Sequence, residues 1–193
     1  YWFYVTGFIP LDKDPDSVDQ KLIDHYGIEI SKWARARRKR SGVASVQYLR
    51  YRRFFVLLAT QGKHRFFTDE APNIRDARKV PIKFSGYAVS CREGRPHVRI
   101  EREEYLRIKA YFLENASKRT ASRIQAELAA LPFEPYAPVR SQYLGFIRAI
   151  NRVRMQAGLS KISQFAVRLK RRIYRPFEPV NDDDDDTMKK GNG

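Results

Sequence analysis

Six cations lie close together in the first quarter of the chain, in a stretch that holds no acidic residue. They are Lys32, Arg35, Arg37, Arg38, Lys39 and Arg40. Cations at helical spacing suit the phosphates of a nucleic acid, because each phosphate that is neutralised releases counterions and adds affinity. A merely solvated helix face usually mixes the two signs of charge. This stretch therefore predicts a phosphate-binding helix.

Two short segments rich in tyrosine, arginine and phenylalanine follow this helix. Residues 44–51 and 53–60 are typical of strands, and the single residue between them favours a tight antiparallel hairpin. Aromatic rings stack on bases while neighbouring cations hold phosphates, so such a hairpin suits a single strand. Since alternate residues take opposite faces, about half of the rings are expected in the core. The residues predicted to bind are Tyr48, Arg50, Tyr51, Arg52 and Arg53.

Further cations lie in the last third of the chain, on a predicted helix and in the segment after it. They extend the predicted nucleic-acid-binding set and are Arg148, Arg152, Arg154, Lys170, Arg171 and Arg172.

A catalytic alternative rests on His97, which lies on a predicted strand, and on Tyr105 and Tyr111 of the following helix. Enzymes that nick single strands attack phosphate with a helical tyrosine beside a metal held by a His-hydrophobic-His pair. Here Arg99 stands in place of the second histidine, and arginine cannot ligate a divalent metal. The sequence therefore predicts no metal site and no cofactor.

The composition narrows the class of protein. The 193 residues carry a formal net charge of +16, which favours a polyphosphate partner. Cys91 is the single cysteine, which excludes an intramolecular disulfide framework and suits a reducing, cytoplasmic location. No apolar run approaches the roughly 20 residues of a membrane-spanning helix, so no membrane partner is expected.

These candidate residues depend on an α+β amino-terminal half. Asp14 is expected to cap a helix with Pro15 at its first position and Gly27 after its end, and Ser31 to cap the cationic helix. Together with the hairpin, further strands are expected at 1–9, 82–91 and 97–100, and a short helix at 71–79. This succession contains the β-α-β-β-α-β order of a ferredoxin-like sheet, with an inserted basic helix and an extra hairpin strand. Strands 1–9 and 53–60 would then be neighbours in the sheet centre.

The rest of the chain is predicted to be helical and basic. Helices are expected at 101–116, 122–131 and 139–157, while residues 160–175 fit either a helix or a strand. The expected organisation is a ferredoxin-like α+β nucleic-acid-binding domain at 1–100, a basic helical region at 101–180 and an acidic disordered tail at 181–193.

The sequence thus predicts a protein that binds nucleic acid, as a non-catalytic subunit beside other proteins of a nucleoprotein complex. RNA or a single-stranded or structured strand is favoured over duplex DNA, because stacking surfaces act on unpaired bases. Two alternatives stay open. One is a metal-dependent nuclease or tyrosine nicking enzyme, and the other is a structural protein that neutralises folded RNA in a large particle.

Overall fold

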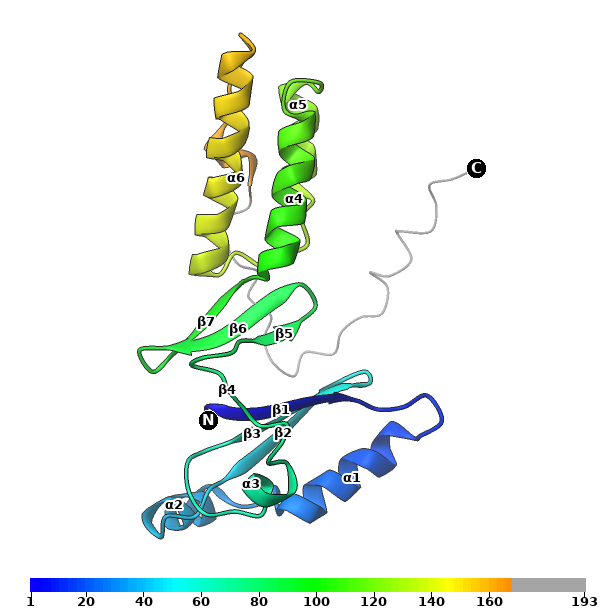
Figure 1. Ribbon diagram of the computed structural model, residues 1–193, viewed down its shortest axis with the longest axis vertical. Coiled ribbons are helices and arrows are strands. Elements are labelled where there is room, and N and C mark those ends of the chain that lie inside the picture. The colour runs from blue at the N-terminus through cyan, green and yellow to red at the C-terminus, as the bar shows by residue number, and fades with distance from the viewer. Residues whose placement is uncertain (168–193) are drawn as a thin grey trace.

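A computed structural model of the chain describes residues 1–167, so Lys170, Arg171, Arg172 and the tail at 181–193 lie outside it. In this range the fold is mixed α+β, as predicted, with two antiparallel sheets and six α-helices. Figure 1 shows the second sheet lying between the first sheet and a group of helices from the later part of the chain.

The first sheet has the strand order β2-β3-β1-β4 and is antiparallel throughout. Its strands are β1 (Phe3–Phe8), β2 (Val46–Tyr51), β3 (Phe54–Ala59) and β4 (Arg75–Asp76). The strand predicted at 1–9 and the second strand of the hairpin are therefore neighbours in the sheet centre, as expected. Arg52 forms the hairpin turn with a left-handed φ of 55°.

Three helices accompany this sheet, namely α1 (Pro15–Tyr26), α2 (Lys32–Arg40) and α3 (Phe66–Asp69). The predicted caps are present, since Asp14 accepts a hydrogen bond from the Ser17 amide and Ser31 accepts one from the Ala34 amide. Gly27 ends α1 with a φ of 54°. The short helix predicted at 71–79 is wrong, because that range holds turns and β4 while α3 forms earlier in the chain.

The second sheet has the strand order β5-β6-β7. Its strands are β5 (Ile82–Phe84), β6 (Tyr87–Arg92) and β7 (Arg95–Ile100). The single strand predicted at 82–91 is split by a turn in which Ser85 and Gly86 both have positive φ, so its two halves pair with each other. Such local pairing closes a short loop at little entropic cost. The predicted ferredoxin-like sheet, with this strand as its fourth, is therefore not confirmed.

The predicted carboxy-terminal helices are confirmed to within two residues at each end, as α4 (Arg102–Asn115), α5 (Ala121–Ala129) and α6 (Ala137–Gln156). They share one buried cluster with the end of β7, in which Ile100, Ile108 and Ile150 take part. The Gln142 side chain also binds both backbone groups of Ile100 at 2.8 and 3.0 Å. The helices and the second sheet are therefore one packed unit.

The two sheets touch through the face of the first sheet that lies opposite α1. The Tyr4 hydroxyl donates to the carbonyl oxygens of Val80 and Pro81 at 3.2 and 3.1 Å. The rings of Phe54 and Phe84 stack with their centres 4.8 Å apart. The first sheet is therefore covered on one face by helices and partly covered on the other by strands.

Candidate nucleic-acid interface

The six cations of α2 have no acidic partner in the part of the chain that the structure describes. Elsewhere, by contrast, Arg78 lies 2.6 Å from Asp76 and Lys83 lies 2.8 Å from Glu101. The positive charge of α2 is therefore not neutralised by acidic side chains of this part of the chain.

Arg35 and Lys39 form one wall of a hollow in the surface. They lie one helical turn apart and therefore project from the same face of α2. The hollow has a volume of about 590 Å³ and is lined by Tyr1, Trp2, Arg35, Ala36, Lys39, Ser45, Thr60 and Gln61. We call it the basic groove. Two like charges at this spacing destabilise a helix by about 0.2–0.5 kcal/mol, and a bound anion would relieve that repulsion.

Trp2 supplies the aromatic wall of the basic groove. The backbone of Trp2 is hydrogen-bonded on both sides. The Trp2 amide donates to the Ala59 carbonyl at 3.2 Å, and the Ala77 amide donates to the Trp2 carbonyl at 2.7 Å. The guanidinium of Arg78 lies 4.9 Å from the centre of its ring. Trp2 was not among the residues that the sequence predicts to bind, although it lines this groove. The predicted pairing of the first and third strands was the signal that could have placed it beside Thr60.

The other four cations of α2 divide into two groups. Arg38 is half-buried and donates to the Gly27 carbonyl at 3.3 Å, so it anchors α2 to the end of α1. The remaining three are exposed, and they are Lys32, Arg37 and Arg40. Trp33 is 76% exposed on the same helix and was not among the residues that the sequence predicts to bind.

Tyr48 and Arg50 do not form the stacking surface that the sequence predicted. Both face α1, where the Tyr48 hydroxyl donates to Asp19 at 2.5 Å. Arg50 donates to Asp19 at 2.8 Å and to Asp16 at 2.9 Å. Burial and the hydrogen bond to Asp19 raise the pKa of Tyr48 well above its ordinary value. These two side chains hold β2 against α1, so we remove them from the proposed interface.

The three residues predicted to bind at the hairpin turn differ in their contacts. Tyr51 is 59% exposed on the opposite face of the sheet, with the Arg52 guanidinium 5.5 Å from the centre of its ring. Arg53 is half-buried and donates to backbone carbonyls of the loop after β1, including those of Pro10 and Lys13. Tyr51 and Arg52 thus remain available to a ligand, whereas Arg53 holds the loop.

Helix α6 carries a second cationic surface. Arg148 and Arg152 are exposed and line a hollow of about 520 Å³ together with Lys161. No ion pair joins these three cations to the part of the chain that the structure describes. We call this surface the α6 patch.

Arg154 is the clearest correction to the predicted set. It is only 3% exposed and donates to the carbonyls of Ala116, Arg119 and Ser160 at 2.8, 2.9 and 2.6 Å. A guanidinium used in this way cannot reach a phosphate. Arg154 therefore joins the ends of α4 and α6 and is removed from the proposed interface.

The three residues of the catalytic alternative lie in separate environments. The Tyr105 ring stacks on Phe146 with centres 4.8 Å apart, and the Tyr111 hydroxyl lies between Arg119 and Glu127. His97 has a buried Nδ1 without a partner in residues 1–167, and burial lowers its pKa. In that range no group of three or more His, Cys, Asp or Glu could hold a metal ion.

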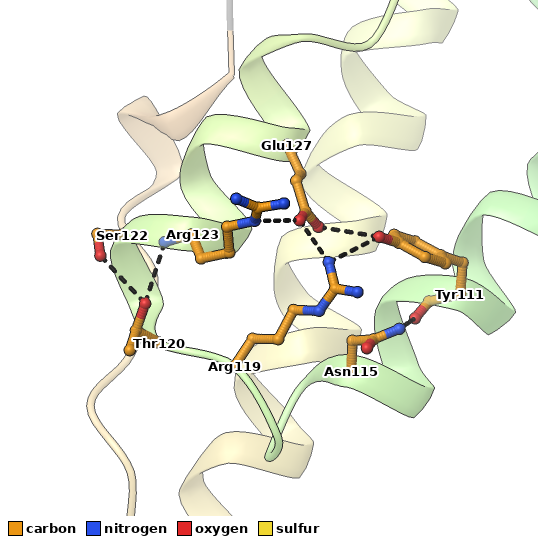
Figure 2. A network of polar contacts seen from close by, with 7 residues as sticks. All are labelled: Tyr111, Asn115, Arg119, Thr120, Ser122, Arg123 and Glu127. Carbon is orange, nitrogen blue, oxygen red and sulfur yellow. Dashed lines mark hydrogen bonds and ion pairs between the residues drawn. The ribbon is translucent and has the colours of Figure 1, made fainter. Parts of the chain in front are cut away.

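Tyr111 belongs to a polar network between α4 and α5, which Figure 2 shows. Its hydroxyl accepts from Arg119 at 2.8 Å and donates to Glu127 at 3.2 Å. Glu127 also accepts from Arg123 at 2.8 Å and from Arg119. Burial of Glu127 is outweighed by these cations, so the pKa of its carboxyl lies below the ordinary value. The network joins the two helices, so the Tyr111 hydroxyl has a structural role.

No protein-family model, no curated protein and no solved structure matches this chain. Within residues 1–167 no helix has the length and hydrophobicity to cross a membrane. The functional assignment must therefore come from the geometry of the basic groove and the α6 patch.

Proposed function

We propose that the chain binds nucleic acid, with a preference for RNA or another strand with unpaired bases, as a non-catalytic subunit of a nucleoprotein complex. The observation that carries the proposal is the basic groove, where Arg35 and Lys39 line the same hollow as Trp2. Unpaired cations hold phosphates, and an aromatic ring gives a base a stacking partner.

The preference for unpaired strands follows from the chemistry of the groove walls. A duplex presents phosphates to the cations but keeps the faces of its bases stacked inside, so Trp2 would gain little from it. A single strand or a loop can place a base on the ring and its phosphates on α2 at the same time. Stacking contributes roughly 1–3 kcal/mol per base.

The α6 patch extends the proposal to a longer or folded strand. It lies on the helical part of the chain, whereas the basic groove belongs to the first sheet and α2 (Figure 1). A strand that contacts both surfaces would neutralise more phosphates than one confined to the groove, and its affinity would depend more steeply on salt.

We also infer a relation of the first sheet to ferredoxin-like sheets. The support is the succession β1, α1, β2, β3, α3, β4 with β1 and β3 as central strands. In this version the two-residue β4 takes the place that the sequence analysis assigned to residues 82–91, and α2 is inserted before β2.

Purification of the chain from its native cells at physiological salt, followed by sequencing of the bound nucleic acid, tests the proposed function. We expect recovery of RNA, or of single-stranded DNA, with the chain. Recovery of the chain without nucleic acid would contradict the proposal. Digestion of the bound strand during incubation with a divalent metal would favour the nuclease alternative.

A further inference from the structure

A second hollow lies between the two sheets, next to the basic groove. It has a volume of about 360 Å³, and its walls include Trp2, Leu58, Ala77, Ile82, Val89 and Cys91. We call it the inter-sheet cleft. Tyr1 and Trp2 line both the cleft and the basic groove, so the two hollows lie on either side of this short segment.

We propose that the inter-sheet cleft takes a single unpaired nucleobase, turned out of a strand whose phosphates lie on Arg35 and Lys39. This inference rests on the proposed function, because it assigns a base-binding site to the same strand. The cleft would make the chain a reader of unpaired bases rather than of phosphates alone.

The shape and chemistry of the cleft fit a flat ring. Its volume lies at the lower end of the range for small-molecule pockets, and most of its walls are apolar side chains. An extruded base is usually held between apolar or aromatic side chains that replace its stacking neighbours in the strand. Trp2 and Leu58 are walls of this kind.

The inter-sheet cleft also has cations on the side away from the basic groove. Arg92 and Arg95 are exposed in the turn between β6 and β7, and they adjoin the lining residues Cys91, Gly94 and Pro96. Neither arginine forms an ion pair within residues 1–167. An apolar cleft with cations on both sides matches a nucleotide, whose base is apolar on its faces and whose flanking phosphates are anionic.

The buried indole nitrogen of Trp2 supports a base in the cleft independently of the cleft's shape. Its Nε1 is buried and has no acceptor in the part of the chain that the structure describes. A buried donor without an acceptor costs roughly 1–3 kcal/mol. The edge of a base carries ring nitrogens and carbonyl oxygens that accept hydrogen bonds, so a small turn of the Trp2 side chain toward a bound base would remove this cost.

Cys91 allows a direct test, because it is the only cysteine of the chain and lines the cleft. The rate of Cys91 alkylation by a maleimide is measured for the full chain alone, with a short oligouridylate, and with an abasic oligomer of equal length and charge. Fluorescence anisotropy measures the affinity for both oligomers. We expect the oligouridylate to slow alkylation several-fold at saturation. The abasic oligomer should bind about tenfold more weakly and leave the alkylation rate unchanged.

A variant that fills the cleft gives a second measurement. Cys91→Phe should remove the preference for the oligouridylate over the abasic oligomer while leaving the salt dependence of binding unchanged, and Cys91→Ser should keep both. Urea unfolding shows whether each variant is folded, and the alkylation result for the unaltered chain stands without them.

The outcomes separate the two proposals. If both oligomers bind but change the alkylation rate equally, or not at all, the cleft does not take a base and the proposed function still holds. If neither oligomer binds at physiological salt, the proposed function itself fails.

Discussion

The hydroxyl of Tyr48 on β2 donates a hydrogen bond to the carboxylate of Asp19 on α1 across 2.5 Å. Arg50, two residues further along the same strand, donates to the same carboxylate. An aromatic ring and a cation that suit RNA binding in the sequence are thus used to hold a helix against the sheet. This relationship leaves the basic groove, which α2 and Trp2 line, as the proposed interface.

Tyr48→Phe should therefore affect stability rather than binding. Loss of the hydroxyl leaves Asp19 with one donor fewer in a partly buried position, and we expect the free energy of unfolding to fall by about 1 kcal/mol. Urea unfolding measures this change, and Tyr51→Phe, whose side chain is 59% exposed on the opposite face of the sheet, is the matched control. A weaker affinity for oligouridylate with unchanged stability would return Tyr48 to the interface.

The alternation of residues along β2 explains why the sequence alone could not assign these side chains to the α1 face. Alternation shows that Tyr48 and Arg50 share a face and that Tyr51 lies on the other. It does not show which face the helix α1 covers, since that depends on a contact with Asp16 and Asp19, about 30 residues away. By contrast, the caps Asp14 and Ser31 and the hairpin were predictable because short-range hydrogen bonds and turn geometry determine them.

Arg152 and Arg154 form a natural pair of variants, since they are two residues apart and only one is buried. Arg154→Met should lower the free energy of unfolding by about 3 kcal/mol or more, because three carbonyls lose a charged donor. Arg152→Met should change it by less than about 0.5 kcal/mol and weaken RNA binding at low salt. Thermal unfolding and anisotropy measure the two effects. Equal stability of the two variants would overturn the structural role of Arg154.

The contribution of Glu127 to the free energy of unfolding should depend on pH. Because the pKa of its carboxyl is lowered in the folded chain, its ionised form contributes stability above the unfolded pKa of about 4.3. That contribution is lost as the pH falls through the folded pKa. Glu127→Gln should therefore be less stable than the unaltered chain at pH 7, and the difference should shrink in urea unfolding below about pH 4.

Glu114→Gln is the control for this experiment, because its carboxylate is exposed and, among residues 1–167, pairs only with Lys118, four residues further along the chain. It should change stability little at either pH. If the gap between Glu127→Gln and the unaltered chain were the same at both pH values, ionised Glu127 would not be what stabilises the network.

Of the two walls of the basic groove, the sequence predicts only the cationic one on α2. The run of cations on α2 is evident from the local composition, and Arg35 and Lys39 fall on one face by helical spacing alone. The aromatic wall depends on the antiparallel pairing that brings the start of β1 beside the end of β3, near Thr60. The split of the predicted strand at 82–91, which creates the inter-sheet cleft, depends on a turn that contains a non-glycine residue with positive φ, and composition gives little warning of that.

The salt dependence of binding to oligouridylate tests the central claim most directly. Each phosphate contact on a single strand contributes about 0.7 to the slope of log K against log salt concentration, so Arg35→Gln with Lys39→Gln should reduce that slope by about 1.4. Lys13→Gln with Lys21→Gln removes the same charge from exposed positions away from the groove and should leave the slope nearly unchanged. An equal slope for the unaltered chain and the Arg35/Lys39 variant would contradict the assignment of the basic groove as the nucleic-acid site.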